Sequence, residues 1–596
     1  MKKKQIIYGF IAGLSILSTG VLTGCGDKFQ EEYPWLVGNQ EEQDNEEEDG
    51  AGRYDMELLE KELRGAIPFM INYSHEPDGS WQPHKYQYQR ANNIDNYAGY
   101  WTVSKATFGF GGALPTLYTY PNDYLGGPID NTVFVQSYNA LHYAIDMKDK
   151  DDETKIIASR PEWRAIALII QAYVGHEVVD FIGAAPFNDW RNRVRSRSLE
   201  YEPGADVYNQ IFDDLDEAVE LLNATQPSAD DLRRIEDIEN DKTISYGDWR
   251  RWVKFANSIK LRMAMNIVKY DPVLAQTKAE EAVNDPIGVL TEGDRDIAYY
   301  HISGGGCALY FIGNTWSDCR LNANMEIILK HFKNPLLTVW FDTNPYPIKN
   351  KLTGIDAPTD VYGIRAGISM TNKNTAAKDK GGYSPFATLQ VKDMPQAFIK
   401  VNEVLFLRAE GALRGWNMGG DAKSFYERGI RNCFQEFGLD ASQADEYLAQ
   451  TNLPIVDYAD PYDSENDCPG RVSIGVNYDS FQTNEERLEG IITQKWICNF
   501  PMGAEAWTTY RRTGYPRLIP VKINGMADMG VDTELQIRRI PQIVSTNNTA
   551  EMASLGTAIG GDQKDLSIRV FWDVPTEQRG AVNPENNTPY VIPVNF

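Results

Sequence analysis

The stretch DWRRWVKFANSIKLRMAMNI, residues 248–267, decides the class of fold. Its apolar side chains recur every three or four positions, at Trp249, Trp252, Phe255, Ala256, Ile259, Met263 and Ile267. This spacing matches the 3.6-residue period of an α-helix and places these side chains on one face. The stretch therefore predicts a helix that begins near Asp248 and packs its apolar face inside the protein.

Helical signals recur on both sides of this stretch. Residues 161–182 are apolar on most faces, which predicts a buried helix, and Ser159-Arg160-Pro161-Glu162 resembles a capping box at its start. The charged residues Glu162, Arg164 and Glu177 argue against a membrane span there. Further helices are predicted around residues 208–222, 396–414, 421–438, 485–500 and 503–512.

Two of these helices predict a helical hairpin. The helix over residues 396–414 stops at Gly415, and Asp421 is a suitable N-cap for the next one. Recurring hairpins of this kind favour a mainly α fold with tetratricopeptide-like stacking. Strand signals are few and short, such as residues 567–571. Long aromatic-rich loops lie over residues 74–125, 298–318 and 344–395, and such loops are where function is first sought.

Charge and composition narrow the function classes. The 596-residue chain has a formal net charge of −26, so binding to a phosphate backbone is excluded as its main task. Aromatic residues make up 11% of the chain and include 13 Trp and 32 Tyr. Because these rings combine an apolar face with a polar tip, their abundance suits both a core and a sugar-binding surface.

The N-terminus predicts export and a lipid anchor. Lys2 to Lys4 precede an apolar run, which ends in a Leu-Thr-Gly-Cys sequence at Cys25 and resembles the lipobox of bacterial lipoproteins. We expect a signal peptide over residues 1–24, an acylated Cys25 with an acidic tether over residues 25–52, and a single domain over residues 53–596. The lipid would hold the protein on a membrane without spanning it.

Several motifs together resemble the SusD/RagB family of Bacteroidetes nutrient-binding outer-membrane lipoproteins. Each is short, but they occur in the family's order over nearly the whole chain. They are the lipobox, Phe181 to Pro186, Tyr208 to Leu222, Trp252 to Arg262, Glu403 to Glu410 with Tyr426 to Ile430, and Lys495 to Pro516. The closing segment, Ile537 to Pro541, only approximates the family pattern.

The resemblance implies a function as well as a fold. It implies four tetratricopeptide-like hairpins that support a ligand-binding face, with no catalysis and no cofactor or metal. It also implies a SusC-like TonB-dependent transporter as partner and an outer-membrane location facing the cell surface. Ligands in the family are mostly oligosaccharides, and some members handle peptides. The residues Trp507, Arg511 and Arg512 are expected to hold a helix end against the scaffold, with the arginines able to pair with carboxylates.

Candidate ligand residues follow from the chemistry of a sugar ring. Its C–H faces need an exposed aromatic ring, and its hydroxyls need amide or carboxylate partners. An early loop and a mid-chain loop around Gly304 to Gly306 supply both, as they do in starch-binding relatives. The stacking candidates are Trp81, Tyr97, Trp101, Tyr300 and Trp316, and the hydrogen-bonding candidates are Asn92, Asn93 and Asp95.

Three alternatives stay open at this point. A surface glycoside hydrolase would need two carboxylates across a cleft, and 84 acidic residues leave that possible. A transporter lid or a peptide-binding lipoprotein would need no glycan site. The helical sequence His176-Glu177-Val178-Val179-Asp180 lacks the second histidine of a zinc protease, so it predicts no metal site.

Overall fold

The computed structural model describes residues 60, 63–64, 83–104, 160–191, 198–240, 243–300, 306–344, 348–349, 356–357, 359–368, 382–541 and 548–596. All of them lie in the unit that spans Glu60–Phe596. The predicted signal peptide, Cys25, the acidic tether and Trp81 lie outside the described residues.

The central helix is α8, Pro161–Ile182, and it confirms the predicted buried helix. Every residue of α8 except Pro161 and Arg164 is buried, so this helix, which is long and apolar enough to cross a membrane, lies inside the protein. The predicted capping box is wrong, because Arg160 is the N-cap and its side chain makes no capping hydrogen bond. Pro161 starts the helix instead, since its fixed φ suits the first turn.

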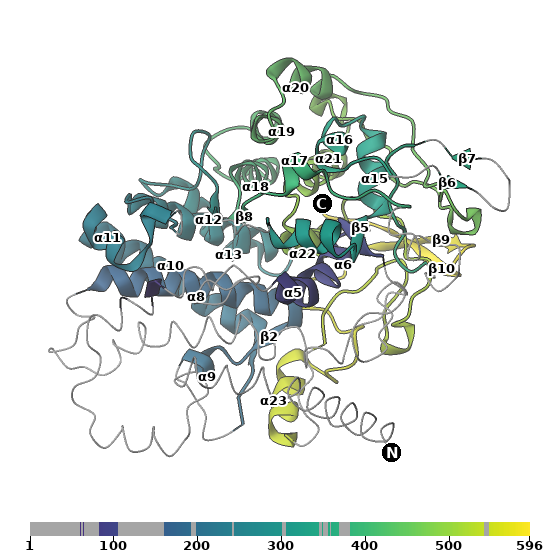
Figure 1. The fold of residues 1–596 in the computed structure, drawn as a ribbon. Helices are drawn as coiled ribbons and strands as arrows, with labels where there is room; N and C mark the ends of the chain where they lie inside the picture. The colour runs from purple at the N-terminus through teal and green to yellow at the C-terminus, as the bar shows by residue number, and fades with distance from the viewer. Residues whose placement is uncertain are drawn as a thin grey trace, which may run out of the picture. The chain divides into compact units, whose positions relative to one another are not determined.

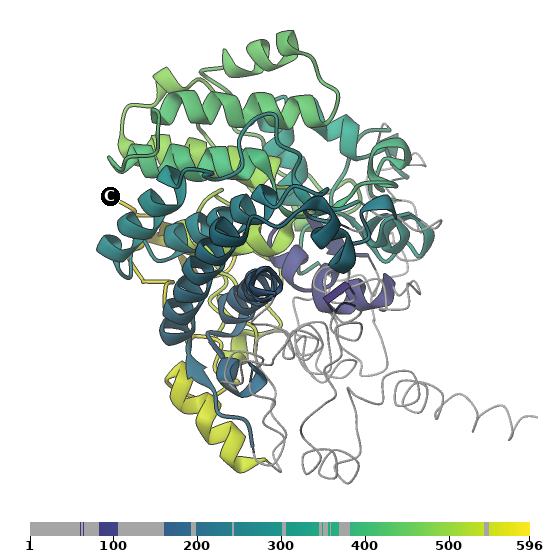
Figure 2. The same cartoon turned by 90° about the vertical axis from the view of Figure 1, so that its left-hand side faces the viewer.

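Helical hairpins stack beside α8 (Figures 1 and 2). The amphipathic helix α10, Gly204–Thr225, packs along α8 and then against α12, Arg250–Asn266. Helix α13, Pro272–Asn284, returns along α12, and α18, Val401–Leu413, forms the predicted hairpin with α19, Ala422–Glu436. Asp421 is the N-cap of α19 and accepts a hydrogen bond from the Ser424 amide, as expected. This arrangement confirms the mainly α, tetratricopeptide-like prediction.

Two helices close this scaffold. Helix α21, Asn484–Cys498, packs on α18 and α19, and α22, Gly503–Thr513, follows it after one turn. The other helices among the described residues are α5 (Pro83–Tyr86), η1 (Gln87–Ala91), α6 (Ile94–Tyr97), α9 (Phe187–Arg191), α11 (Ala229–Ile235), η4 (Ile238–Asn240), α14 (Ala308–Tyr310), η5 (Phe311–Thr315), α15 (Ala323–His331), α16 (Leu336–Trp340), α17 (Thr388–Val391), α20 (Ala441–Leu448), η6 (Ser464–Asn466), η7 (Tyr478–Ser480), η8 (Ala527–Met529) and α23 (Thr549–Ile559).

The described strands form antiparallel two-stranded ribbons. These are β1 (Trp101–Val103) with β5 (Cys319–Leu321), β2 (Ala184–Ala185) with β3 (Glu202–Pro203), β4 (Ile297–Tyr299) with β8 (Gln396–Ile399), β6 (Ile348–Lys349) with β7 (Asp356–Ala357), and β9 (Gln578–Asn583) with β10 (Thr588–Ile592).

The strand predictions need two corrections. Residues 567–571 form turns and no strand, whereas the C-terminal hairpin β9–β10 was not predicted. Residues 396–399 form β8 and not the first turn of a helix, because they pair with β4 about a hundred positions earlier in the chain. Helix α18 therefore starts at Val401.

The family motifs meet in a buried ion network between α12, α18, α21 and α22. Arg262 donates from Nε and Nη2 to the two carboxylate oxygens of Glu403, at 2.7 and 2.8 Å. Lys495 donates to Glu505 Oε1 at 2.5 Å. Both pairs are buried, so they fix the relative positions of the helices that carry them.

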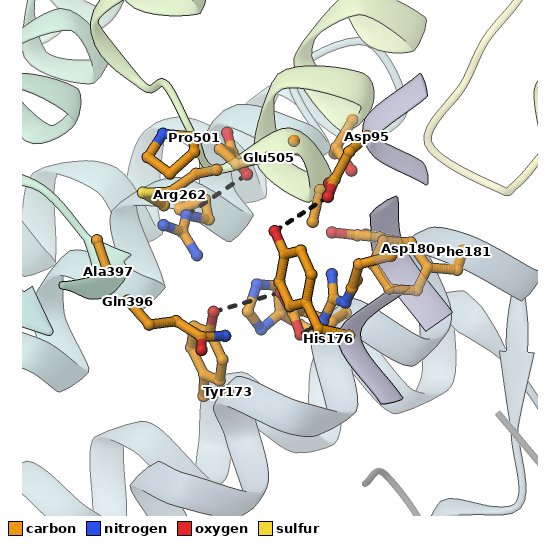
Figure 3. A pocket seen from close by; sticks show the side chains of 17 residues that line it. Asp95, Tyr173, His176, Asp180, Phe181, Arg262, Gln396, Ala397, Pro501 and Glu505 are labelled. Carbon is orange, nitrogen blue, oxygen red and sulfur yellow. Dashed lines mark hydrogen bonds and ion pairs between the residues drawn. The ribbon is translucent and has the colours of Figure 1, made fainter. Parts of the chain in front are cut away.

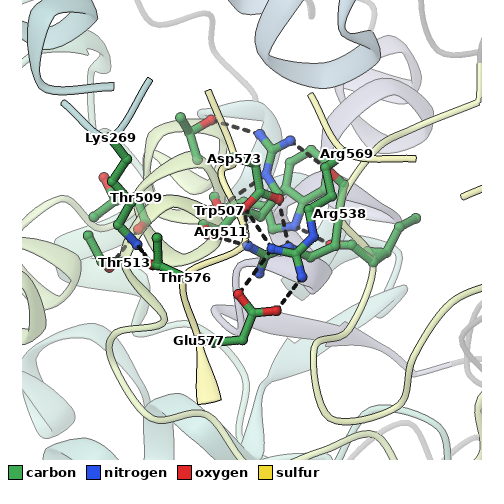
Figure 4. Close-up of polar contacts among 12 residues, drawn as sticks. Lys269, Trp507, Thr509, Arg511, Thr513, Arg538, Arg569, Asp573, Thr576 and Glu577 are labelled. Carbon is green, nitrogen blue, oxygen red and sulfur yellow. Dashed lines mark hydrogen bonds and ion pairs between the residues drawn. The ribbon is translucent and has the colours of Figure 1, made fainter. Parts of the chain in front are cut away.

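The block around α22 has the structural role that the sequence predicts. Arg512 makes a bidentate pair with Glu410, at 2.7 and 2.6 Å. Arg511 instead donates to the carbonyls of Asp180 and Arg538, at 2.6 and 3.0 Å, and its guanidinium lies 3.5 Å from the ring centroid of Trp507. Figure 4 shows this side of α22 with its polar contacts. These residues hold α22 against the core.

Candidate ligand-binding site

Two π turns distinguish the region where the two predicted loops lie. In η1 the amide of Asn92 donates to the carbonyl of Gln87, and in η5 the amide of Trp316 donates to that of Phe311, each across five residues. Each π turn directly follows a short α-helix, α5 or α14. Because π turns are rare and concentrate at functional sites, their occurrence in both loops marks this region.

The structure brings these two loops together. Strand β1 pairs with β5, so that Trp101 lies opposite Leu321 and Val103 opposite Cys319. Gln87 Nε2 donates to Asp318 Oδ2 at 2.6 Å, and α5 packs on α14 and η5. The early segment and the mid-chain segment are therefore in direct contact.

Apolar side chains reach the surface where these segments meet helix α17. Trp316 and Phe311 are half-buried, and their rings meet edge to face at 4.9 Å and 74°. Tyr310 is also half-buried, and its hydroxyl lies 3.3 Å from Thr388 Oγ1 at the start of α17. The next residue, Leu389, is 95% exposed. We call Tyr310, Phe311, Trp316 and Leu389 the aromatic patch.

Hydrogen bonds to backbone groups on both sides of α17 fix this helix beside η5. Asn314 Nδ2 donates to the Phe386 carbonyl at 2.7 Å, and its Oδ1 accepts from the Phe386 amide at 3.1 Å. The Cys307 amide donates to the Lys392 carbonyl at 2.7 Å. Leu389 is thus presented by a turn that is held at both ends, so its exposure is a property of the fold and not of a loose loop.

Five of the predicted ligand residues lie beneath this surface and not on it. Tyr97 and Trp101 are buried, the former against Trp507 at 5.8 Å and the latter edge to face with Phe386 at 5.9 Å. Asn92, Asn93 and Asp95 are buried as well. In this structure these side chains support the early segment from inside the protein and are closed to a sugar ring.

The buried polar groups have structural partners in most cases. Asn93 caps α6 by accepting a hydrogen bond from the Ile94 amide at 2.8 Å, and Asp95 accepts one from the Tyr86 hydroxyl at 3.0 Å. Trp101 Nε1 donates to the carbonyl of Ala91 at 3.0 Å. The amide group of Asn92 makes no hydrogen bond to a described residue. The dense aromatic and amide composition of this segment therefore reflects packing.

The other two described candidates are accessible. Tyr300 is half-buried at the end of β4, and the guanidinium of Arg295 lies 3.6 Å from its ring centroid, which covers one face of the ring. Trp316 keeps its place as a stacking candidate in the aromatic patch. Tyr310, Phe311 and Leu389 were not among the candidates, although the first two lie a few positions after the glycines at 304–306. Leu389 has no sequence signal, because exposure of a lone leucine follows only from tertiary structure.

A small polar cavity lies behind the early segment (Figure 3). It has a volume of about 70 Å³ and is lined by residues of η1, α6, α8, α12, β8 and α22. Its charged groups are engaged: Arg90 pairs with Glu177 at 2.7 Å, and Asp180 accepts hydrogen bonds from Tyr208 and Trp572, at 2.5 and 2.8 Å. A cavity of this size holds a few water molecules but no sugar ring.

Burial is the largest cause of the pKa shifts of two cavity residues, Asp95 and His176. Burial raises the pKa of Asp95 to about 7, although Arg90 and the Tyr86 hydroxyl oppose the change. Burial and the charge of Arg262 lower the pKa of His176 to about 4. Among the described residues there is no group of three or more His, Cys, Asp or Glu side chains that could hold a metal ion.

The buried Asp95 predicts a pH effect on stability. An acid whose pKa is raised by folding stabilises the folded state most below its unfolded pKa of about 3.8, and this contribution is lost as pH rises through 7. We expect Asp95→Asn to lose less stability than the wild type between pH 5 and pH 8, as measured by urea denaturation midpoints. The exposed-site control Asp393→Asn should keep the wild-type dependence. Equal pH dependence in Asp95→Asn and wild type would contradict this assignment.

The described residues form a scaffold of stacked helical hairpins, which defines a mainly α, tetratricopeptide-like protein. The model of the SusD-like family, described as "Susd and RagB outer membrane lipoprotein", matches residues 42–573, so the chain belongs to this family. This membership confirms the resemblance deduced from the motifs, and the family's description supports an outer-membrane lipoprotein. No match was found among curated proteins.

Solved structures agree in fold over most of the chain. A chitin-binding SusD homologue from Flavobacterium johnsoniae is 29% identical, with a TM-score of 0.73, and the match covers 87% of this chain and 99% of that one. A SusD homologue from Bacteroides thetaiotaomicron is 28% identical, with a TM-score of 0.70 and coverage of 87% and 99%. One from Bacteroides vulgatus is 25% identical, with a TM-score of 0.71 and coverage of 88% and 99%.

Proposed function

We propose that this protein is a non-catalytic surface lipoprotein that binds nutrient oligosaccharides at the aromatic patch and delivers them to a SusC-like TonB-dependent transporter. The observation that carries the proposal is that α14 and the π turn η5 present Tyr310, Phe311 and Trp316 beside the exposed Leu389 of α17. Anchoring to the outer membrane through Cys25, with the domain facing the cell surface, belongs to the same proposal. The transporter partner and delivery belong to it as well, and membership in the family supports them.

The patch chemistry favours a sugar that bears acetamido groups. An N-acetyl sugar adds a methyl group and a planar amide to its C–H faces, and both find suitable partners in aromatic rings and an exposed leucine. One relative of 29% identity is described as chitin-binding. Chito-oligosaccharides are therefore the first ligands to test, with Tyr300 as a further contact beyond the patch.

The carboxylates of the small cavity favour a binding protein over a glycoside hydrolase. The carboxylates of Glu177 and Glu505 in the small cavity are paired with Arg90 and Lys495. A glycosidase needs one carboxylic acid and one carboxylate that both reach the scissile bond of a sugar in an open cleft. The patch residues themselves carry no carboxylate.

The test is calorimetric titration of the full-length chain, purified in detergent, with chitohexaose, cellohexaose and maltohexaose. We expect saturable binding of chitohexaose, weaker binding of the other two, and recovery of all three at their original length by mass spectrometry. Shortened products would overturn the non-catalytic role. Absence of saturable binding to any of the three would count against glycan capture and favour a peptide ligand or a lid role.

A further inference from the structure

A second and larger cavity lies under the C-terminal hairpin. Its volume is about 270 Å³, and it is bounded by the end of α22, the segments over residues 514–518 and 534–538, and strand β10. None of its lining residues belongs to the aromatic patch or to the small polar cavity. Since liquid water occupies about 30 Å³ per molecule, the volume corresponds to about nine waters, which is room for one sugar-sized ring.

The arginines of this cavity are neutralised by carboxylates. Arg471 pairs with Glu534 at 2.6 Å, Arg517 with Glu489 at 2.9 Å, and Arg538 with Asp573 at 2.6 Å. Glu577, which also lines the cavity, pairs with Arg569 at 2.5 Å. Each of these cations therefore has its counter-charge in place before any ligand arrives.

Lys269 is the exception. It lines the cavity, and its Nζ donates to the hydroxyl of Thr576 at 2.7 Å (Figure 4). The Thr576 hydroxyl in turn donates to the Val594 carbonyl at 2.6 Å. No carboxylate among the described residues forms an ion pair with it. An ammonium has three N–H donors, so the hydrogen bond to Thr576 leaves further donors for a ligand.

The surroundings of Lys269 disfavour its charge in the free protein. Burial, together with the charges of Arg512, Arg538 and Arg414, lowers its pKa to about 8, while Asp573 opposes the change. An anion placed beside the ammonium would offset this penalty. The lining residues and their ion-pair partners carry one positive charge more than they carry negative charges, which matches a ligand with a single negative charge.

The remaining walls suit a small ring with both polar and apolar parts. Tyr510 and Tyr590 contribute rings, and Val591, Ile592 and Pro593 contribute apolar surface from β10 and the residue that follows it. The guanidinium of Arg471 lies 5.1 Å from the ring centroid of Tyr590, so this ring is held in place from one side. A hydrated, divalent inorganic anion would leave these apolar walls without a partner.

We propose that this cavity binds a small hydroxylated carboxylate, the chemistry of a uronic acid, through an ion pair with Lys269. This site is separate from the aromatic patch and does not depend on glycan capture there. Thr576 positions the ammonium at the cavity wall, and the tyrosines contact the ligand's ring.

The experiment titrates the full-length chain in detergent at pH 7 with sodium D-glucuronate, with D-glucose as the uncharged analogue and with sodium sulfate. We expect saturable glucuronate binding, at least tenfold weaker glucose binding, and sulfate binding weaker than glucuronate. Lys269→Gln should weaken glucuronate binding at least tenfold. The matched control is Lys564→Gln, which removes the same charge from an exposed side chain and should leave the affinity unchanged.

Two further measurements test the role of Lys269 even if Lys269→Gln folds poorly. Raising the pH from 7 to 9.5 should weaken glucuronate binding to the unaltered protein, because the ammonium loses its proton. Lys269→Arg, which retains the charge, should bind more tightly than Lys269→Gln. The proposal is overturned by the absence of glucuronate binding, by equal binding of glucose or sulfate, or by an affinity that does not change with pH.

Discussion

Replacing Glu410 by alanine should lower the free energy of unfolding by about 3–5 kcal/mol, the range for breaking a buried ion pair from one side. Glu410 is fully buried on α18 and accepts two hydrogen bonds from Arg512 of α22, at 2.7 and 2.6 Å. Arg414 adds two more to Oε1, at 3.1 and 3.0 Å. Burial alone would raise the pKa of Glu410, but the two arginines prevail and hold it at about 2.

The large loss of stability in Glu410→Ala comes from the buried Arg512 guanidinium, which loses its carboxylate partner. Without Glu410, the guanidinium of Arg512 stays buried with no carboxylate partner, and its desolvation is no longer offset. The measurement is urea denaturation followed by tryptophan fluorescence at pH 7. Asp479→Ala breaks the exposed Lys423–Asp479 pair and should shift the midpoint much less, because solvent screens that pair.

A double variant separates the ion pair from simple packing. Glu410→Leu combined with Arg512→Met replaces both charges by apolar groups, so it should be more stable than Glu410→Ala. If Glu410→Ala has no larger effect than Asp479→Ala, the proposed role of this pair in joining α18 to α22 is wrong. An equal loss of stability in the double variant would indicate that volume and not charge governs the site.

The helical scaffold was readable from the sequence because its signals are local. The apolar spacing around Trp252 predicts α12, the N-cap Asp421 predicts α19, and Gly503 to Arg512 predicts α22 to within one residue. Such patterns depend on residues a few positions apart, and the physics of one turn is enough to interpret them.

The features that the sequence did not predict depend on contacts between residues far apart in the chain. Gln396 to Ile399 looks like the beginning of a helix, yet pairing with β4 makes it a strand. The hairpin β9–β10 was missed because Gln578 to Asn583 has weak strand propensity and gains its structure from its partner. The partners of Arg262 and Arg512 lie more than a hundred positions away, and no local pattern names them.

The candidate site shows the same limit. Trp101 and Trp316 are equally good stacking residues as sequence, but the first lies under Phe386 and Phe500 and the second reaches the surface. Trp101 lies in β1, which pairs with β5 inside the protein, whereas Trp316 follows η5 outside both strands. The sequence therefore pointed to the mid-chain segment that carries Trp316, but it did not distinguish side chains that face solvent from those that are buried.

Trp316 is accordingly the residue whose loss should affect ligand binding most. Its half-exposed indole is held by the edge-to-face contact with Phe311 and by the backbone hydrogen bond that closes η5. A preorganised ring gives stacking energy without the entropy needed to order it, so Trp316→Ala should weaken chitohexaose binding at least tenfold, or about 1.4 kcal/mol. Trp316→Phe, which keeps an aromatic face, should retain part of the affinity.

Two control variants tie this result to the patch. Trp416 is another half-buried tryptophan, on the turn between α18 and α19, and Trp416→Ala should leave the calorimetric affinity unchanged. Trp101→Ala removes a fully buried ring, so it should lower the denaturation midpoint through a core cavity. If Trp316→Ala binds chitohexaose as the wild type does while the wild type binds it saturably, glycan binding occurs elsewhere, and Tyr300 becomes the next residue to test. If both Trp316→Ala and Trp416→Ala weaken binding equally, the ligand contacts the helical hairpins and not the aromatic patch.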